Sequence, residues 1–293
     1  MHLLLPLFAA VVFALGSMVY KRAFTEGAGV VHALVVNNLV LGLIFLPLLA
    51  ISPDPVPWSL AHLPVVTASV FVVGHLLNVL ALQSGDVSVA TPLLGAKVIF
   101  VALVGWCAFG VRLNAGQWLA AALATAGVLA MGLTDRRTSG RLGLTTATAL
   151  GSAAAFAFTD VMIQTWGSRF GVMNFLPLQF AALAILSMAT LPFFGLRSLR
   201  APRAAWKWIA GAAALSAIQA LTITGTIAVW RDAAGVNVVY ATRGLWSIAL
   251  VWVAGPYLGN TERHTAGSRQ MLQRLLGATL ILLAVVLTFR QGV

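Results

Sequence analysis

Long apolar stretches, separated by short polar breaks, follow one another along almost the whole chain. A helix needs roughly 20 mainly apolar residues to cross a hydrocarbon layer about 30 Å thick. Ten stretches approach or exceed this length: residues 3–20, 30–51, 60–82, 87–111, 117–133, 144–166, 172–194, 206–230, 233–257 and 271–289. Continuous runs of this kind are typical of helices rather than of the alternating strands of a membrane barrel. We therefore predict an all-α polytopic membrane protein with ten transmembrane helices.

The composition strengthens this prediction. Apolar residues make up 60% of the chain and charged residues 9%, and the mean hydropathy is +0.95, whereas an ordinary soluble domain has roughly 25% charged residues. The net charge is +11, but the basic residues fall in the breaks between apolar stretches and not in one tail. We therefore expect the lipid bilayer, through its headgroups, to be their partner, and we expect no nucleic acid.

The two halves of the chain resemble each other. Residues 13–17 align with residues 156–160 at an offset of 143, and Trp106 falls on Trp252 at an offset of 146. Each half holds five predicted spans, and because five is odd, the second half enters the membrane upside down relative to the first, as in many secondary transporters. We predict a first five-helix repeat over residues 1–134, a connecting loop over 135–143 and a second, inverted five-helix repeat over 144–293.

Short motifs in the fourth predicted span resemble a known family. The span begins with Ala-Thr-Pro-Leu-Leu at residues 90–94, and Gly110, Val111 and Arg112 close it. With the five-plus-five layout, these motifs resemble the EamA-like transporter family of the drug/metabolite transporter superfamily, in which Glu commonly takes the place of Val111. The resemblance implies a transporter of small solutes, which we expect in the inner membrane of a bacterial cell.

The side on which the termini lie stays open. The resemblance implies cytoplasmic termini. The breaks on the terminal side hold about four basic residues and those on the opposite side about twelve, so the positive-inside rule favours termini outside.

Three charged residues lie near the middle of predicted spans: Lys97, Asp160 and Arg243. A charge at the bilayer centre costs roughly 2.5–3.5 kcal/mol on insertion scales, so such residues need a partner or a purpose. Lys97 falls on Arg243 at the 146-residue offset, and equivalent mid-span positions of inverted repeats converge near the midplane. Two cations and one carboxylate leave about one positive charge, which favours an anion. Arginine supplies a planar fork for carboxylate or phosphate, and lysine a movable charge.

Polar residues on neighbouring helical faces extend this candidate substrate-binding site. They are His75, Asn78, Gln219, Thr222, Tyr240, Trp246 and Ser247. The last three lie three or four positions from Arg243, within reach of the same cavity. Alternatives stay open. Asp160 is also interpretable as a structural ion-pair partner of one of the two cations. The polar residues over 216–226 could form hydrogen bonds between helices, and His75 could donate a hydrogen bond in helix packing rather than relay a proton.

The function that these features favour is secondary transport of a small anionic or zwitterionic metabolite by alternating access. Exchange for a counter-substrate, or proton movement through Asp160 or His75, would couple it. The plastid phosphate translocators of the same superfamily resemble the chain in using basic residues on spans four and nine to hold phosphate. Two alternatives remain, namely a flippase for an anionic lipid or lipid-linked phosphate, and a non-transporting membrane subunit or intramembrane enzyme. The sequence lacks P-loop, HExxH and CxxC patterns, so we expect no enzyme activity, no catalytic residue, no cofactor and no bound metal.

Overall fold

The computed structural model describes residues 2–85, 87–132, 142–194, 200–254 and 268–291. Over these residues the chain is helical and contains no β-strand. Seven of the described helical segments are long and apolar enough to cross a membrane, and shorter apolar helices cover Lys97–Phe109, Ala115–Ala130 and Leu276–Arg290. The helical membrane fold class is therefore confirmed, and the chain is an integral membrane protein.

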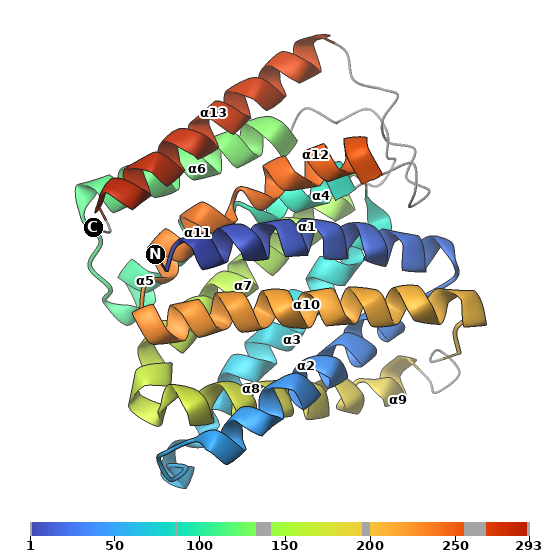
Figure 1. The fold of residues 1–293 in the computed structure, drawn as a ribbon, viewed down its shortest axis with the longest axis vertical. Helices are drawn as coiled ribbons and strands as arrows, with labels where there is room; N and C mark the ends of the chain where they lie inside the picture. The colour runs from blue at the N-terminus through green and yellow to red at the C-terminus, as the bar shows by residue number, and fades with distance from the viewer. Residues whose placement is uncertain (1, 86, 133–141, 195–199, 255–267, 292–293) are drawn as a thin grey trace.

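The helices follow the predicted spans in order, as Figure 1 shows. The first half of the chain forms α1 (Leu4–Thr25), η1 (His32–Val36), α2 (Asn37–Phe45), η2 (Leu46–Ile51), η3 (Trp58–Leu60), α3 (His62–Ser84), α4 (Val87–Leu94), α5 (Lys97–Phe109) and α6 (Ala115–Gly132). The second half forms α7 (Leu142–Phe170), α8 (Val172–Ala189), α9 (Leu191–Phe194), α10 (Arg203–Trp230), α11 (Ala233–Tyr240), α12 (Arg243–Ala254) and α13 (Ser268–Gln291). The connecting loop is predicted over residues 135–143. Residues 135–141 lie outside the described part of the chain, and residues 142 and 143 belong to α7.

Two of the predicted spans are broken helices. The span predicted over residues 87–111 consists of α4 and α5, and the described part of the span predicted over 233–257 consists of α11 and α12. Backbone amides at both breaks, those of Ala96 and Thr242, donate to the carbonyl three residues earlier at 3.1 Å, which tightens the chain into a turn. The Thr242 hydroxyl also donates to the carbonyl of Val239 at 2.8 Å and so competes with a continued helix. The prediction of one continuous helix for each span is corrected to two half-helices.

Helices from the two halves of the chain pack side by side. α1 lies along α10, α3 along α7, and α6 along α13 (Figure 1). Small residues permit the approach of the last pair, because a Cβ added to Gly127 of α6 would lie only 2.6 Å from the carbonyl oxygen of Gly277 on α13. Close backbone packing of this kind holds membrane helices together, since lipid tails are as apolar as the side chains that face them.

A cluster of aromatic rings joins α2, α3 and α8. The rings of Phe45 and Phe180 stack with their centroids 4.0 Å apart. Phe71 on α3 meets the ring of Phe180 edge-on at 5.6 Å, a favourable arrangement for aromatic pairs. This packing fixes Phe71, one of the residues that line the candidate site.

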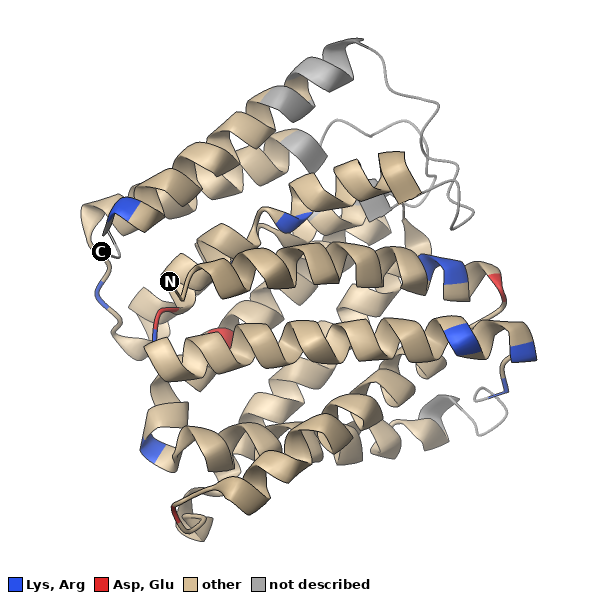
Figure 2. Ribbon diagram, in the orientation of Figure 1, with Lys and Arg blue, Asp and Glu red and all other residues tan. Residues whose placement is uncertain are grey.

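Charged residues gather at the two ends of the bundle (Figure 2). Where α1 ends, the guanidinium of Arg22 lies 5.7 Å from the ring centroid of Trp208 and 2.6 Å from the carboxylate of Glu26. At the opposite end, the imidazole of His2 lies 3.7 Å from the carboxylate of Asp232. Charges and aromatic rings at both ends suit the headgroup layers and the water beyond them.

Candidate functional site

The two broken helices position the two buried cations. Lys97 is the first residue of α5, and Arg243 is the first residue of α12. Both side chains are buried, with exposed fractions of 6% and 4%. The first turn of a helix carries free amide groups and a partial positive charge. In α12, however, the amides of Gly244, Leu245 and Trp246 donate to carbonyls across the break, and in α5 that of Val98 does so. The positive charge inside the bundle therefore comes mainly from the two side chains.

Lys97 is held by a carboxylate from another helix. Its Nζ lies 2.5 Å from Oδ2 of Asp160 on α7, and the same oxygen accepts a hydrogen bond of 2.6 Å from Nδ2 of Asn237 on α11. Nδ2 of Asn237 also donates to the carbonyl of Ala233 at 2.8 Å, which fixes the amide's orientation. Buried charges are tolerated when they are paired and hydrogen-bonded. This Lys97–Asp160–Asn237 network ties α5, α7 and α11 together.

Arg243 makes a different set of contacts. Its guanidinium carbon lies 4.8 Å from the ring centroid of Phe13 on α1 and 4.5 Å from that of Tyr240 on α11. One terminal nitrogen donates to the carbonyl of Leu94, the last residue of α4, so the cation satisfies a free carbonyl at a helix C-terminus. The Nε of Arg243 is buried and has no hydrogen-bond partner. The guanidinium thus keeps a donor that a ligand can satisfy.

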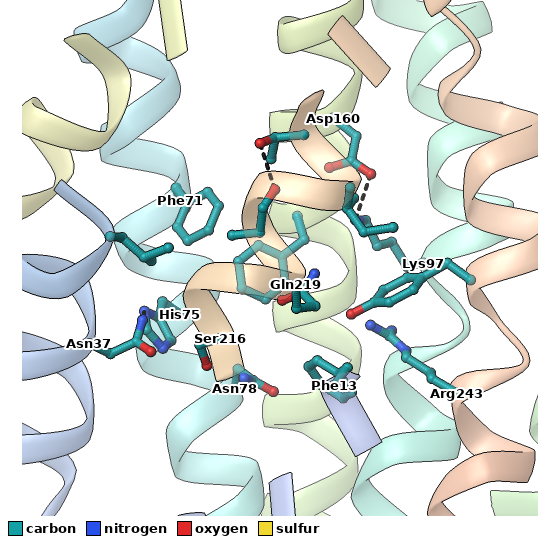
Figure 3. Close-up of a pocket in the computed structure, with 16 residues that line it drawn as sticks. Phe13, Asn37, Phe71, His75, Asn78, Lys97, Asp160, Ser216, Gln219 and Arg243 are labelled. Carbon is teal, nitrogen blue, oxygen red and sulfur yellow. Dashed lines mark hydrogen bonds and ion pairs between the residues drawn. The ribbon is translucent and has the colours of Figure 1, made fainter. Parts of the chain in front are cut away.

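A cavity lies beside these cations (Figure 3). Its lining comes from both halves of the chain: Phe13, Asn37, Leu41, Phe71, His75, Asn78, Lys97, Phe156, Asp160, Ser216, Gln219, Ala220, Ile223, Thr224, Tyr240 and Arg243. Figure 3 shows Lys97 and Arg243 on one side and Asn37 and His75 on the other, with Gln219 between them. A mixture of aromatic walls with a few convergent polar groups is typical of small-molecule sites.

The side of this central cavity away from the cations consists of uncharged polar groups. Nδ1 of His75 lies 2.6 Å from Oδ1 of Asn38, and the hydroxyl of Tyr20 donates to Oδ1 of Asn37 at 2.6 Å. Oδ1 of Asn78, which also lines the cavity, is buried without a hydrogen-bond partner. This side therefore offers a solute amide groups, one of which has a free acceptor.

A second cavity lies toward the end of the bundle where α10 ends and α11 begins. The polar residues in its lining are Arg112, Gln117, Gln164, Arg231 and Asp232. Gln164 follows Asp160 by one turn of α7, and Val101, also in the lining, follows Lys97 by one turn of α5. The Lys97–Asp160–Asn237 network therefore lies between the two cavities.

The central cavity brings together seven of the residues predicted from the sequence: Lys97, Arg243, Asp160, His75, Asn78, Gln219 and Tyr240. Three others lie outside its lining. The hydroxyl of Thr222 donates to the carbonyl of Ile218 at 2.7 Å, that of Ser247 donates to the carbonyl of Arg243 at 2.9 Å, and Trp246 is 37% exposed. The prediction for Trp246 and Ser247 assumes a continuous helix, whereas Arg243 starts α12 and its side chain reaches back to α4.

The aromatic walls are the part of the cavity that the sequence reasoning did not single out. Phe13, Phe71 and Phe156 all line it. Phe13 and Phe156 are equivalent at the 143-residue offset, so the internal repeat carried a signal for two of them. On α10 the lining residues are Ser216, Gln219, Ala220, Ile223 and Thr224. They follow the three- and four-residue spacing of one helical face, with Thr224 four residues after Ala220.

The bundle, its broken helices and its buried charged cavity define a polytopic α-helical membrane protein. Residues 1–133 match the profile of the EamA-like transporter family, which is part of the drug/metabolite transporter superfamily. That family consists of membrane transporters of small solutes. The resemblance suggested by the motifs of the fourth span is therefore confirmed over the first half of the chain.

The fold has a counterpart among solved structures. One of them, described only as "Crystal structure of protein", superposes with a TM-score of 0.62 and 16% sequence identity, and the match covers 95% of each chain. At this identity the likeness is one of fold, and it extends over nearly the whole chain. No curated protein matches the sequence.

Proposed function

We propose that the chain is a secondary transporter that moves a small anionic or zwitterionic metabolite across the inner membrane of a bacterium by alternating access. The observation that carries the proposal is the position of Lys97 and Arg243. Each is the first residue of a half-helix, and both line the same buried cavity. Half-helix N-termini that meet at a central cavity are where secondary transporters hold the anionic groups of their substrates.

The architecture that we propose is ten spans in two inverted repeats, residues 1–134 and 144–293. The equivalence of the broken helices supports it, because α11 and α12 begin 146 residues after α4 and α5 (233 − 87 and 243 − 97). The packing supports it as well. The first helix of each half lies along the third long helix of the other, α1 on α10 and α7 on α3, and the last helices, α6 and α13, pair with each other. A pseudo-two-fold axis through the cavity accounts for all of these pairs.

Alternating access requires a barrier on one side of the site at a time. The Lys97–Asp160–Asn237 network lies between the central cavity and the cavity at the end of the bundle. We assign it the role of the barrier on that side. An anionic solute that binds the ammonium group of Lys97 competes with the carboxylate of Asp160. Binding of the solute therefore weakens the ion pair and the barrier. Exchange for a counter-substrate, or a proton carried by Asp160 or His75, would then couple the cycle.

A thermal-shift screen of the purified full-length chain against organic acids, phosphate esters and amino acids tests this function. A bound solute stabilises the folded state by mass action, so the compound that raises the melting temperature most is the candidate substrate. We expect Arg243→Gln to abolish that shift and Lys207→Gln, an exposed cation at the start of α10, to keep it. A shift that survives Arg243→Gln would place binding elsewhere and contradict the proposal.

A further inference from the structure

The charges that line the central cavity are unevenly compensated. Within the described part of the chain, the charged residues of the lining are Lys97, Asp160 and Arg243, with His75 counted as neutral at pH 7. Lys97 and Asp160 neutralise each other through their 2.5 Å ion pair. Arg243 forms no ion pair with any described residue; its partners are the rings of Phe13 and Tyr240, the hydroxyl of Tyr240 and the carbonyl of Leu94. The lining therefore carries one uncompensated positive charge.

The unpartnered nitrogen of Arg243 favours a ligand with an acceptor group. Nε of Arg243 is a buried donor without a hydrogen-bond partner, on a side chain that is 4% exposed. Leaving a donor of a charged group unsatisfied in a buried place is costly. A carboxylate is the common partner of a guanidinium, because its two oxygens match the planar fork.

The walls of the cavity favour an apolar body on the same ligand. Phe13, Phe71, Phe156 and Tyr240 contribute rings, and the rings of Phe71 and Phe156 meet edge-on at 5.1 Å. Leu41, Ala220 and Ile223 add aliphatic surface. An inorganic ion would leave these walls in contact with water, whereas a ring removes apolar surface from it.

From this charge balance and these walls we infer that the solute is an organic monoanion with an aromatic or similarly apolar body. The inference rests on the proposed transport function and narrows its substrate class. A zwitterion adds no net charge, so lining and ligand together still carry one positive charge. A dianion carries one charge too many for Arg243 alone, and a cation is repelled. Of these four classes, only a monoanion brings the net charge of lining and ligand together to zero.

A series of ligands that share a phenyl ring but differ in charge tests the inference. Isothermal titration calorimetry on the full-length protein in detergent would compare 3-phenylpropionate, the dianion benzylmalonate, the zwitterion L-phenylalanine and the cation 3-phenylpropylamine, with propionate as the ligand that lacks the ring. We expect 3-phenylpropionate to bind at least about tenfold more tightly than each of the others. Tighter binding of L-phenylalanine, benzylmalonate or propionate overturns the inference.

A change of one cavity charge sharpens the same test. Asp160→Asn leaves Lys97 without its carboxylate, so the lining then carries two uncompensated cations. We expect this variant to reverse the preference and to bind benzylmalonate more tightly than 3-phenylpropionate. Glu26→Gln, which removes a carboxylate at the end of α1, is the matched control and keeps the wild-type preference. A folded Asp160→Asn protein that still prefers the monoanion contradicts the charge argument.

The outcomes also separate this inference from the proposed function. If wild type prefers the zwitterion or the dianion and Arg243→Gln abolishes that binding, the site stands and only the substrate class is wrong. If folded wild type binds no member of the series but is stabilised by another anion of the thermal-shift screen, only the substrate class is wrong. If it binds no anion or zwitterion of the series or of that screen, the substrate class and the proposed function both fail.

Discussion

Lys97 and Arg243 occupy equivalent positions in the two halves of the chain but are compensated in different ways. Lys97 has a carboxylate at 2.5 Å, while Arg243 has two aromatic rings and a backbone carbonyl. Removing one partner of a buried ion pair leaves an uncompensated charge, whereas removing both leaves none. Single and double substitutions therefore separate the structural role of the Lys97–Asp160 pair from its role in transport.

The first prediction concerns this pair. Lys97→Met leaves the Asp160 carboxylate buried without its cation and should destabilise the protein by about 3–5 kcal/mol. The double variant Lys97→Met, Asp160→Leu removes both charges and should recover most of the melting temperature. We expect the double variant to remain inactive in transport, because the cavity has lost one of its cations. A stable double variant with normal transport would show that the pair serves stability alone.

The second prediction concerns the shape of the Arg243 side chain. Arg243→Lys keeps the charge but loses the flat face between Phe13 and Tyr240 and the fork that grips a carboxylate. We expect calorimetry to show roughly tenfold weaker binding of 3-phenylpropionate, equivalent to about 1.4 kcal/mol. Binding at wild-type strength would mean that the charge of Arg243 is sufficient and its planar group is not used.

The sequence predicted the charged part of the site better than its walls. Lys97, Asp160 and Arg243 stand out because charge is rare within apolar spans, and their side chains all reach the central cavity. Phe13 and Phe156 do not stand out, because aromatic residues are common in such spans and only the tertiary packing decides which of them face a cavity.

At the scale of helices, the sequence predicts the positions of the spans well. It predicts the breaks within two of these spans only in part. Hydropathy counts apolar residues over a window and does not detect a turn of three residues. Gly95 gave a local hint of the first break, since glycine weakens a helix. Ala241 and Thr242 gave little hint of the second, which depends on the hydrogen bond from the Thr242 hydroxyl to the Val239 carbonyl. The internal repeat is the stronger signal, because it relates one break to the other.

The third prediction concerns the contact between α6 and α13. Gly127→Ala places a Cβ only 2.6 Å from the carbonyl oxygen of Gly277, so the helices must separate, and overpacking of this kind costs about 1–3 kcal/mol. Gly225→Ala on α10 is the matched control, because no atom lies within 4 Å of its added Cβ. We expect a lower melting temperature in detergent for Gly127→Ala and an equal or higher one for Gly225→Ala. Equal melting temperatures for both variants would contradict the close packing of α6 and α13.

At the scale of the whole molecule, the two halves supply complementary parts of one cavity. Phe13, His75 and Lys97 come from the first half, and Asp160, Tyr240 and Arg243 come from the second. In the mechanism that we propose, rocking of one half against the other would change access to the site without dismantling either half. This is the alternating-access arrangement that inverted repeats support.

The fourth prediction concerns topology. α1 begins and α13 ends at the same end of the bundle (Figure 1), and ten crossings return the chain to its starting side. We expect fluorescent and phosphatase reporters to place both termini on the same side of the membrane. A cytoplasmic location would agree with the family resemblance, and an external one with the positive-inside rule. Reporters that place the termini on opposite sides would require an odd number of crossings and would rule out the ten-span architecture.

The most direct test of the central claim is uptake by proteoliposomes of the anion that stabilises the wild-type protein most. The assay compares wild type, Lys97→Gln, Arg243→Gln and the control Lys207→Gln, with protein-free liposomes as the baseline and melting temperatures as the check on folding. We predict wild-type uptake for Lys207→Gln and uptake near the baseline for both cavity variants, because each lacks one of the two cations of the proposed binding site. Undiminished uptake by folded Lys97→Gln and Arg243→Gln proteins would contradict the account.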